Sequence, residues 1–158
     1  MGNQPPTPAG AMTDQPAASP RIFLEPELRH LLAREVQRCT RYQDFLSVCL
    51  VRPDYVPAAG ADTQIGVARR IAELLRSTDI IGAVGGDIAI LLVHTPEADA
   101  VPILDRVRER IQATTFPGAT APVQVTVSLG LASFPTDATS DTALLAQAQA
   151  QLPPSPVG

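Results

Sequence analysis

The spacing of apolar residues along the chain changes between the period of a helix and the period of a strand. Four segments have the helical period of three to four residues, and in the first three the opposite face is charged. These segments predict helices at 28–39 (with Pro26 in its first turn), 63–76, 103–111 and 142–152. Ser140 or Asp141 can cap the last of them.

The third helix has two possible starts. Thr95, Pro96 and Glu97 provide an N-cap, a first-turn proline and an early acid. This start places Pro102 inside the helix, where its ring costs a hydrogen bond. With Asp99 as the N-cap, Pro102 falls in the first turn, where a missing N–H is tolerated. The sequence leaves both starts open.

Short apolar runs rich in β-branched residues predict the strands. Strands are expected at 46–51, 80–81, 88–93 and 123–134. Gly85 and Gly86 lie between the second and third strands and favour a tight hairpin, because glycine reaches positive φ without a steric cost. The last strand is the longest, and its apolar and polar residues alternate.

The order of these elements is helix, strand, helix, strand, strand, helix, strand, helix. A β-α-β-β-α-β core with flanking helices predicts an α+β protein of the ferredoxin-like type, with an antiparallel sheet backed by helices on one face. One domain is expected at 21–152. Residues 1–20 are rich in proline and alanine and are expected to be a disordered arm, and 153–158 a short tail.

Composition excludes several classes of function. A net charge of −4, the absence of tryptophan and an aromatic content of 4% argue against binding to a nucleic acid polymer. No apolar run is long enough for a membrane span and no signal peptide is visible, which predicts a soluble cytoplasmic protein. Cys39 and Cys49 lie in apolar contexts without metal-site spacing, so buried free thiols are expected.

Four stretches resemble the GGDEF domains, the diguanylate cyclases that join two GTP molecules into cyclic di-GMP. They are LLAREVQRCTRYQDFLSVCLV, RSTDIIGAVGGD, VTVSLGLASFPTD and LLAQAQAQL, and together they span most of 28–152. The VTVS stretch, which begins at Val125, is the most specific of the four. The resemblance implies the palm of a nucleotidyl cyclase, a fold of the ferredoxin-like type.

The departures from the family pattern concern its metal ligands. The resemblance implies two divalent cations, held by an aspartate at the end of the first strand and by an acid in the hairpin. Arg52 stands at that strand end, and no acid follows before Asp54. In the signature hairpin Gly85, Gly86 and Asp87 match, whereas Ile88 and Ala89 replace the next acid and the phenylalanine. We therefore expect no metal, no cofactor and no catalytic residues; an unusual metal site at Asp54 and Asp87 is the remaining enzymatic alternative.

The segment from Arg76 to Asp79 keeps the R-x-x-D pattern of the family's inhibitory site, which binds cyclic di-GMP. An arginine fork matches a guanine edge or a phosphate, and a carboxylate can accept hydrogen bonds from guanine N–H groups. Arg106 is roughly where some relatives supply a second arginine. The predicted function is thus a catalytically inactive cyclic di-GMP receptor that signals through a homodimer or a protein partner. Ordinary turn residues at 76–79 are the structural alternative, and an interaction scaffold without nucleotide binding is the functional one.

Overall fold

A computed structural model of the chain describes residues 21–54 and 59–153. The expected arm at 1–20 and all but the first residue of the expected tail lie outside the described residues. A five-stranded sheet has the order β1 (Ile22–Phe23), β3 (Ile80–Val84), β4 (Asp87–Val93), β2 (Leu46–Asp54), β7 (Thr126–Phe134). The helices are α2 (Glu25–Tyr42), α3 (Ala61–Glu73), α4 (Glu97–Gln112) and α5 (Asp141–Ala150).

The sheet confirms the predicted α+β class. Its four long strands pair antiparallel, β3 with β4, β4 with β2 and β2 with β7, which is the strand order of a ferredoxin-like fold. The two residues of β1, which the sequence pattern did not predict, add a parallel partner to β3 and make the sheet mixed.

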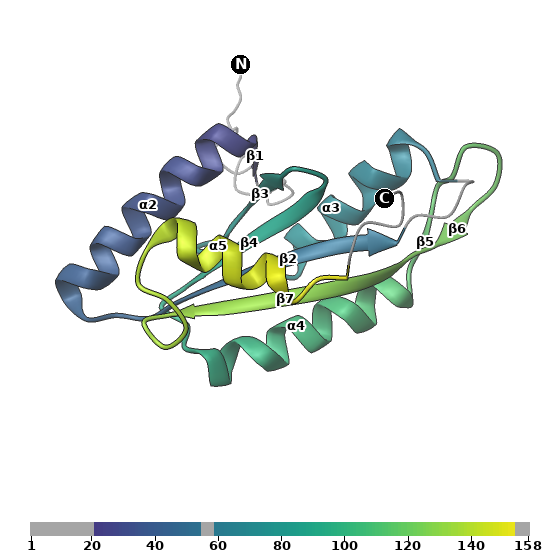
Figure 1. Cartoon of the computed structure of the whole chain (residues 1–158). Helices are drawn as coiled ribbons and strands as arrows, with labels where there is room; N and C mark the ends of the chain where they lie inside the picture. The colour runs from purple at the N-terminus through teal and green to yellow at the C-terminus, as the bar shows by residue number, and fades with distance from the viewer. Residues whose placement is uncertain (1–20, 55–58, 154–158) are drawn as a thin grey trace, which may run out of the picture.

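Helices cover both faces of this sheet, whereas one face was expected. The crossover helices α3 and α4 pack on one face, and the flanking helices α2 and α5 pack on the other, so that α4 and α5 lie on opposite sides of the long strand β7 (Figure 1). The strands β2 and β4 are consequently buried on both faces. Their apolar residues are continuous rather than alternating, because each side of the strand meets a helix layer.

One helix boundary differs from the prediction, and the structure decides between the two starts left open for another helix. α3 ends at Glu73 rather than at Arg76, so Arg76 lies in the turn that leads to β3. α4 begins at Glu97, which excludes Asp99 as the N-cap and places Pro102 inside the helix. Pro102 is exposed, and the buried face of α4 offsets the lost hydrogen bond. That face consists of Ala100, Leu104, Val107 and Ile111.

The expected strand at 123–134 is divided in two. Val123–Gln124 forms the strand β6, which pairs with β5 (Thr115–Phe116) as a separate two-stranded sheet, and β7 begins at Thr126. The alternation is continuous through this break, so the pattern alone could not reveal it. The N-cap of α5, for which the sequence allowed Ser140 or Asp141, is Ser140. Its side chain accepts a hydrogen bond from the Ala143 N–H at 3.1 Å.

Both cysteines are buried and free, as expected. Burial raises the pKa of the Cys49 thiol to about 12, so this thiol stays protonated at neutral pH. Within the part of the chain that the structure describes, no helix combines the length and the apolar character needed to cross a bilayer.

The close contact between α5 and β7 predicts how an added methyl group at Gly130 affects the stability of the domain. A Cβ at Gly130 would lie 2.0 Å from the Ala148 carbonyl oxygen, whereas a Cβ at Gly86 would meet nothing within 4 Å. We expect Gly130→Ala to lower the free energy of unfolding by about 2 kcal/mol through overpacking, with little change for Gly86→Ala. Urea denaturation of both variants measures this, and equal midpoints would contradict the close approach.

Candidate functional site

The residues singled out in the sequence lie at opposite ends of the strand β4. Asp87 begins β4 beside the Gly85–Gly86 turn, and Val93 ends it. Arg76 reaches Val93, with its Nη2 3.1 Å from the Val93 carbonyl oxygen. The hairpin and the R-x-x-D segment are therefore two separate sites, which are described in turn.

At the hairpin end, Asp87 forms a bidentate ion pair with Arg52. Arg52 Nε donates to Asp87 Oδ1 at 2.8 Å and Nη2 donates to Oδ2 at 2.9 Å. The pairing of Val51 with Ile88 in the β2–β4 ladder places the two side chains side by side on the same face. The Asp87 side chain is only 7% exposed and that of Arg52 28%. A nearly buried carboxylate thus receives its counter-charge from the protein itself.

The backbone of the hairpin turn is also occupied by the protein. Gly85, with a positive φ of 61°, donates its N–H to the Glu25 carboxylate of α2 at 2.7 Å. This hydrogen bond, with a further contribution from Arg29, lowers the pKa of Glu25 and keeps it ionised at neutral pH. A backbone N–H that could donate to a phosphate oxygen therefore faces a fixed negative charge.

The other residues of the signature add no polar chemistry. Ala89 is fully buried in the layer beneath α2 and α5, and Ile88 packs against the layer beneath α3 and α4. Asp54 is exposed at the end of β2, and no hydrogen bond or ion pair joins it to Asp87. Across residues 21–54 and 59–153, no group of three or more histidine, cysteine, aspartate or glutamate side chains could hold a metal ion.

At the other end of β4, Arg76 and Asp79 form an ion pair with each other. Arg76 Nη2 donates to Asp79 Oδ1 at 2.9 Å, and Arg76 Nε and its backbone N–H donate to Oδ2 at 3.1 and 2.9 Å. The carboxylate is 1% exposed, whereas the Arg76 side chain is 51% exposed. The pair therefore presents its cation outward and keeps its anion behind it. That this pair binds guanine stays a prediction.

Thr95 is a further partner of Arg76 that the sequence pattern did not reveal. Its buried Oγ1 accepts from Arg76 Nη2 at 2.7 Å and donates to the Val93 carbonyl oxygen at 2.8 Å. Arg76 Nη1 has no hydrogen-bond partner among the described residues, so this corner of the fork is available to a ligand. The position of this polar residue just after a strand could have indicated a site residue, but the sequence pattern indicated Thr95 only as a helix N-cap.

Arg106 is not part of this cluster in the structure. It lies on the exposed face of α4, and no hydrogen bond or ion pair connects it to Arg76 or Asp79 among the residues described. Its predicted participation in ligand binding is untested.

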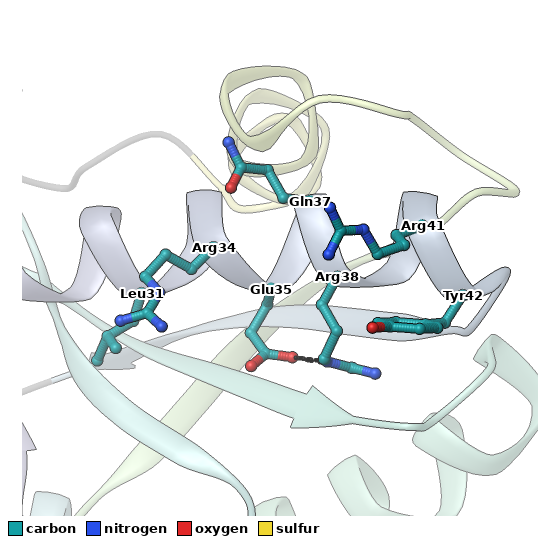
Figure 2. Close-up of a pocket in the computed structure, with 7 residues that line it drawn as sticks. All are labelled: Leu31, Arg34, Glu35, Gln37, Arg38, Arg41 and Tyr42. Atoms are coloured by element: carbon teal, nitrogen blue, oxygen red, sulfur yellow. Dashed lines mark hydrogen bonds and ion pairs between the residues drawn. The ribbon is translucent and has the colours of Figure 1, made fainter.

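A hollow on the outer surface of α2 is lined by residues that belong to neither site. Figure 2 shows the side chains that surround it, with Glu35 and Arg38 turned toward each other. Arg38 Nε donates to Glu35 at 2.9 Å, and its Nη1 donates to Asp44 at 2.6 Å. The residues lining the hollow are Leu31, Arg34, Glu35, Gln37, Arg38, Arg41 and Tyr42.

Comparisons with known proteins point to one family. Residues 58–153 match the family described as "Diguanylate cyclase, GGDEF domain". The chain is 28% identical over 124 residues to the diguanylate cyclase TpbB of Pseudomonas aeruginosa, and the match covers 72% of this chain and 28% of TpbB. It is 25% identical over 111 residues to the probable diguanylate cyclase DgcC of Escherichia coli, covering 65% of this chain and 30% of DgcC. The chain thus spans less than a third of these relatives.

Solved structures agree on the fold. The GGDEF domain of TpbB superposes with a TM-score of 0.74 at 24% identity, covering 82% of this chain and 81% of that structure. The GGDEF domain of DgcB from Caulobacter crescentus, solved in complex with c-di-GMP, gives a TM-score of 0.68 at 15% identity, covering 82% and 80%.

The Arg52–Asp87 pair predicts how much stability the domain loses when Arg52 is replaced. Arg52→Ala leaves Asp87 buried without a partner, and we expect the free energy of unfolding to fall by about 2 kcal/mol. Arg70→Ala, which breaks the exposed pair with Glu73, is the matched control and should cost less than about 0.5 kcal/mol. Chemical denaturation compares the two variants, and equal losses would show that Arg52 contributes no more than a surface charge.

Proposed function

This chain belongs to the GGDEF domain family, and we propose that it is a member without cyclase activity that serves as a receptor for cyclic di-GMP. The observation that carries the first part is the bidentate pair between Arg52 and Asp87. The second part rests on the half-exposed guanidinium of Arg76, which Asp79 and Thr95 hold from behind.

The pair at the hairpin opposes metal binding by charge and by occupancy. Mg²⁺ takes oxygen ligands, usually including carboxylates that balance its charge. Both Asp87 oxygens already accept from Arg52. A cation would have to displace the guanidinium and then tolerate its positive charge nearby. We therefore propose that the clamp on the attacking oxygen and the triphosphate, which the cyclase reaction requires, does not form here.

The Glu25 carboxylate opposes binding of the triphosphate of the substrate. It accepts from the Gly85 N–H, at the turn where a triphosphate oxygen would otherwise be received. A phosphate placed there would lose that donor and would face a like charge. Cation and phosphate are thus both opposed by groups of this chain, Arg52 for the first and Glu25 for the second.

Arg76 retains the chemistry of a receptor. Its planar fork suits a guanine O6/N7 edge or a phosphate, and it is exposed on the side away from Asp79. Because both Asp79 oxygens accept from Arg76, we propose that Asp79 holds the guanidinium in place rather than contacting guanine itself. The ligand would then meet a cation that is already oriented.

A second candidate function is a protein-interaction module, and the hollow on α2 favours it (Figure 2). Three arginines and one glutamate surround this hollow, together with the exposed ring of Tyr42. An acidic protein surface would complement that charge. This role needs neither Arg76 nor Asp79, so it remains open if the chain binds no nucleotide.

Calorimetric titration with cyclic di-GMP tests the receptor. We expect a dissociation constant in the micromolar range, near about −8 kcal/mol. Arg76→Ala should weaken binding by roughly 2 kcal/mol, about thirtyfold, because the charged donor is removed. Arg69→Ala, which removes an exposed charge from α3, is the matched control and should bind like the unaltered chain. No heat at tens of micromolar ligand would reject the receptor and leave the interaction module.

A further inference from the structure

Three buried hydroxyl groups form a row across the end of the sheet where Arg76 lies. Ser47 stands on β2, Ser133 stands opposite it on β7, and Thr95 follows β4. Each of the three is at most 2% exposed. Buried hydroxyls are costly unless they are hydrogen-bonded, so their partners define what the row does.

Hydrogen bonds connect the three residues of the row, partly through the backbone of Thr95. Ser47 Oγ donates to the Thr95 carbonyl oxygen at 2.8 Å and lies 2.7 Å from Ser133 Oγ. Thr95 Oγ1 donates to the Val93 carbonyl oxygen at 2.8 Å and receives Arg76 Nη2 at 2.7 Å. The row therefore ends on the guanidinium of Arg76.

The direction of these bonds is fixed by the number of hydrogens. A hydroxyl has one hydrogen, and that of Ser47 goes to the Thr95 carbonyl, so Ser133 must be the donor to Ser47. The hydrogen of Thr95 goes to Val93, which leaves a lone pair of Oγ1 for the guanidinium. Thr95 can therefore only accept from Arg76, as a cation requires.

We propose that Thr95 is a positioning residue for Arg76, and that Ser47 and Ser133 hold Thr95 in the orientation this requires. The proposal rests on the receptor function of Arg76. Arginine has several rotatable bonds, and fixing them on binding costs conformational entropy. Contacts to Asp79 and Thr95 fix the guanidinium before the ligand arrives, so less of this cost falls on binding.

The row also reaches the turn before α5. The Ser133 N–H donates to Asp137 Oδ2 at 2.8 Å, and the Asp137 N–H donates to the Ser133 carbonyl oxygen at 2.8 Å. The Arg76 end of the sheet and the approach to α5 are thus linked residue by residue, through hydrogen bonds to the side chains and the backbone of Thr95 and Ser133.

Thr95→Val tests the proposal, because it keeps the side-chain shape and removes the acceptor. We expect cyclic di-GMP to bind roughly fivefold more weakly, the effect of losing about one hydrogen bond. We also expect faster hydrogen exchange at Arg76 Nε–H in NMR spectra of the ligand-free chain. Thr95→Ser restores the hydroxyl and should recover both properties, which a purely structural defect would not predict. Thr114→Val, whose Oγ1 bonds only Arg110 on α4 among the described residues, is the matched control.

Two readouts separate this proposal from the receptor function. Unchanged affinity and unchanged Nε–H exchange in Thr95→Val would overturn the positioning role. If the unaltered chain binds no cyclic di-GMP, the receptor function fails, and the exchange rate still decides whether Thr95 positions Arg76. Loss of binding in both Thr95→Val and Thr95→Ser, with normal Nε–H exchange, would also contradict it.

Discussion

The ion pair between Arg52 and Asp87 is the constraint on which the chemistry of this domain depends. A carboxylate that is almost buried needs a counter-charge, because desolvation otherwise opposes its ionised form. Here the antiparallel pairing of β2 with β4 places an arginine beside the carboxylate and satisfies both of its oxygens. The side chain of Arg52 thus supplies a permanent positive charge at the end of β2. At this position the family resemblance implies an acidic residue that would bind a metal ion.

The same two residue types pair with a different exposure at the other end of β4. In the Arg76–Asp79 pair the carboxylate is buried behind the guanidinium, and the guanidinium is half exposed. In the Arg52–Asp87 pair the arginine is less exposed, at 28%, and it also donates to the Pro153 carbonyl oxygen through Nη1. Exposure and spare donors, rather than residue type, therefore distinguish a stabilising pair from a candidate binding group.

Local sequence patterns were sufficient for the fold class and for most of the elements. Apolar periodicity predicted the helices and long strands, and the two glycines predicted the hairpin. Boundaries that depend on tertiary contacts were left open or missed: the sequence could not decide whether a helix continues through Pro102, and it did not reveal the break at Val125. In both places the burial of one face, or pairing with a distant strand, outweighs the local signal.

The contacts of the candidate sites were less predictable than the residues. Arg76, Asp79 and Asp87 were identified from their motifs, but the partners of two of them depend on strand register. Arg52 and Asp87 are 35 residues apart, and Ser47 and Ser133 are 86 apart, so no local pattern joins them. Arg76 and Asp79 were each expected to contact guanine. The structure pairs them with each other, and their binding to guanine stays a prediction.

Binding of Mn²⁺, followed by the electron paramagnetic resonance signal of the free ion, tests most directly whether Arg52 has taken the place of a metal. With millimolar Mn²⁺ and an equal concentration of the protein, we expect the signal of free Mn²⁺ to be the same as in buffer. A decrease in that signal with the unaltered chain, absent with the Asp87→Asn variant, would show a metal ion at the hairpin and would contradict the replacement of the metal by Arg52.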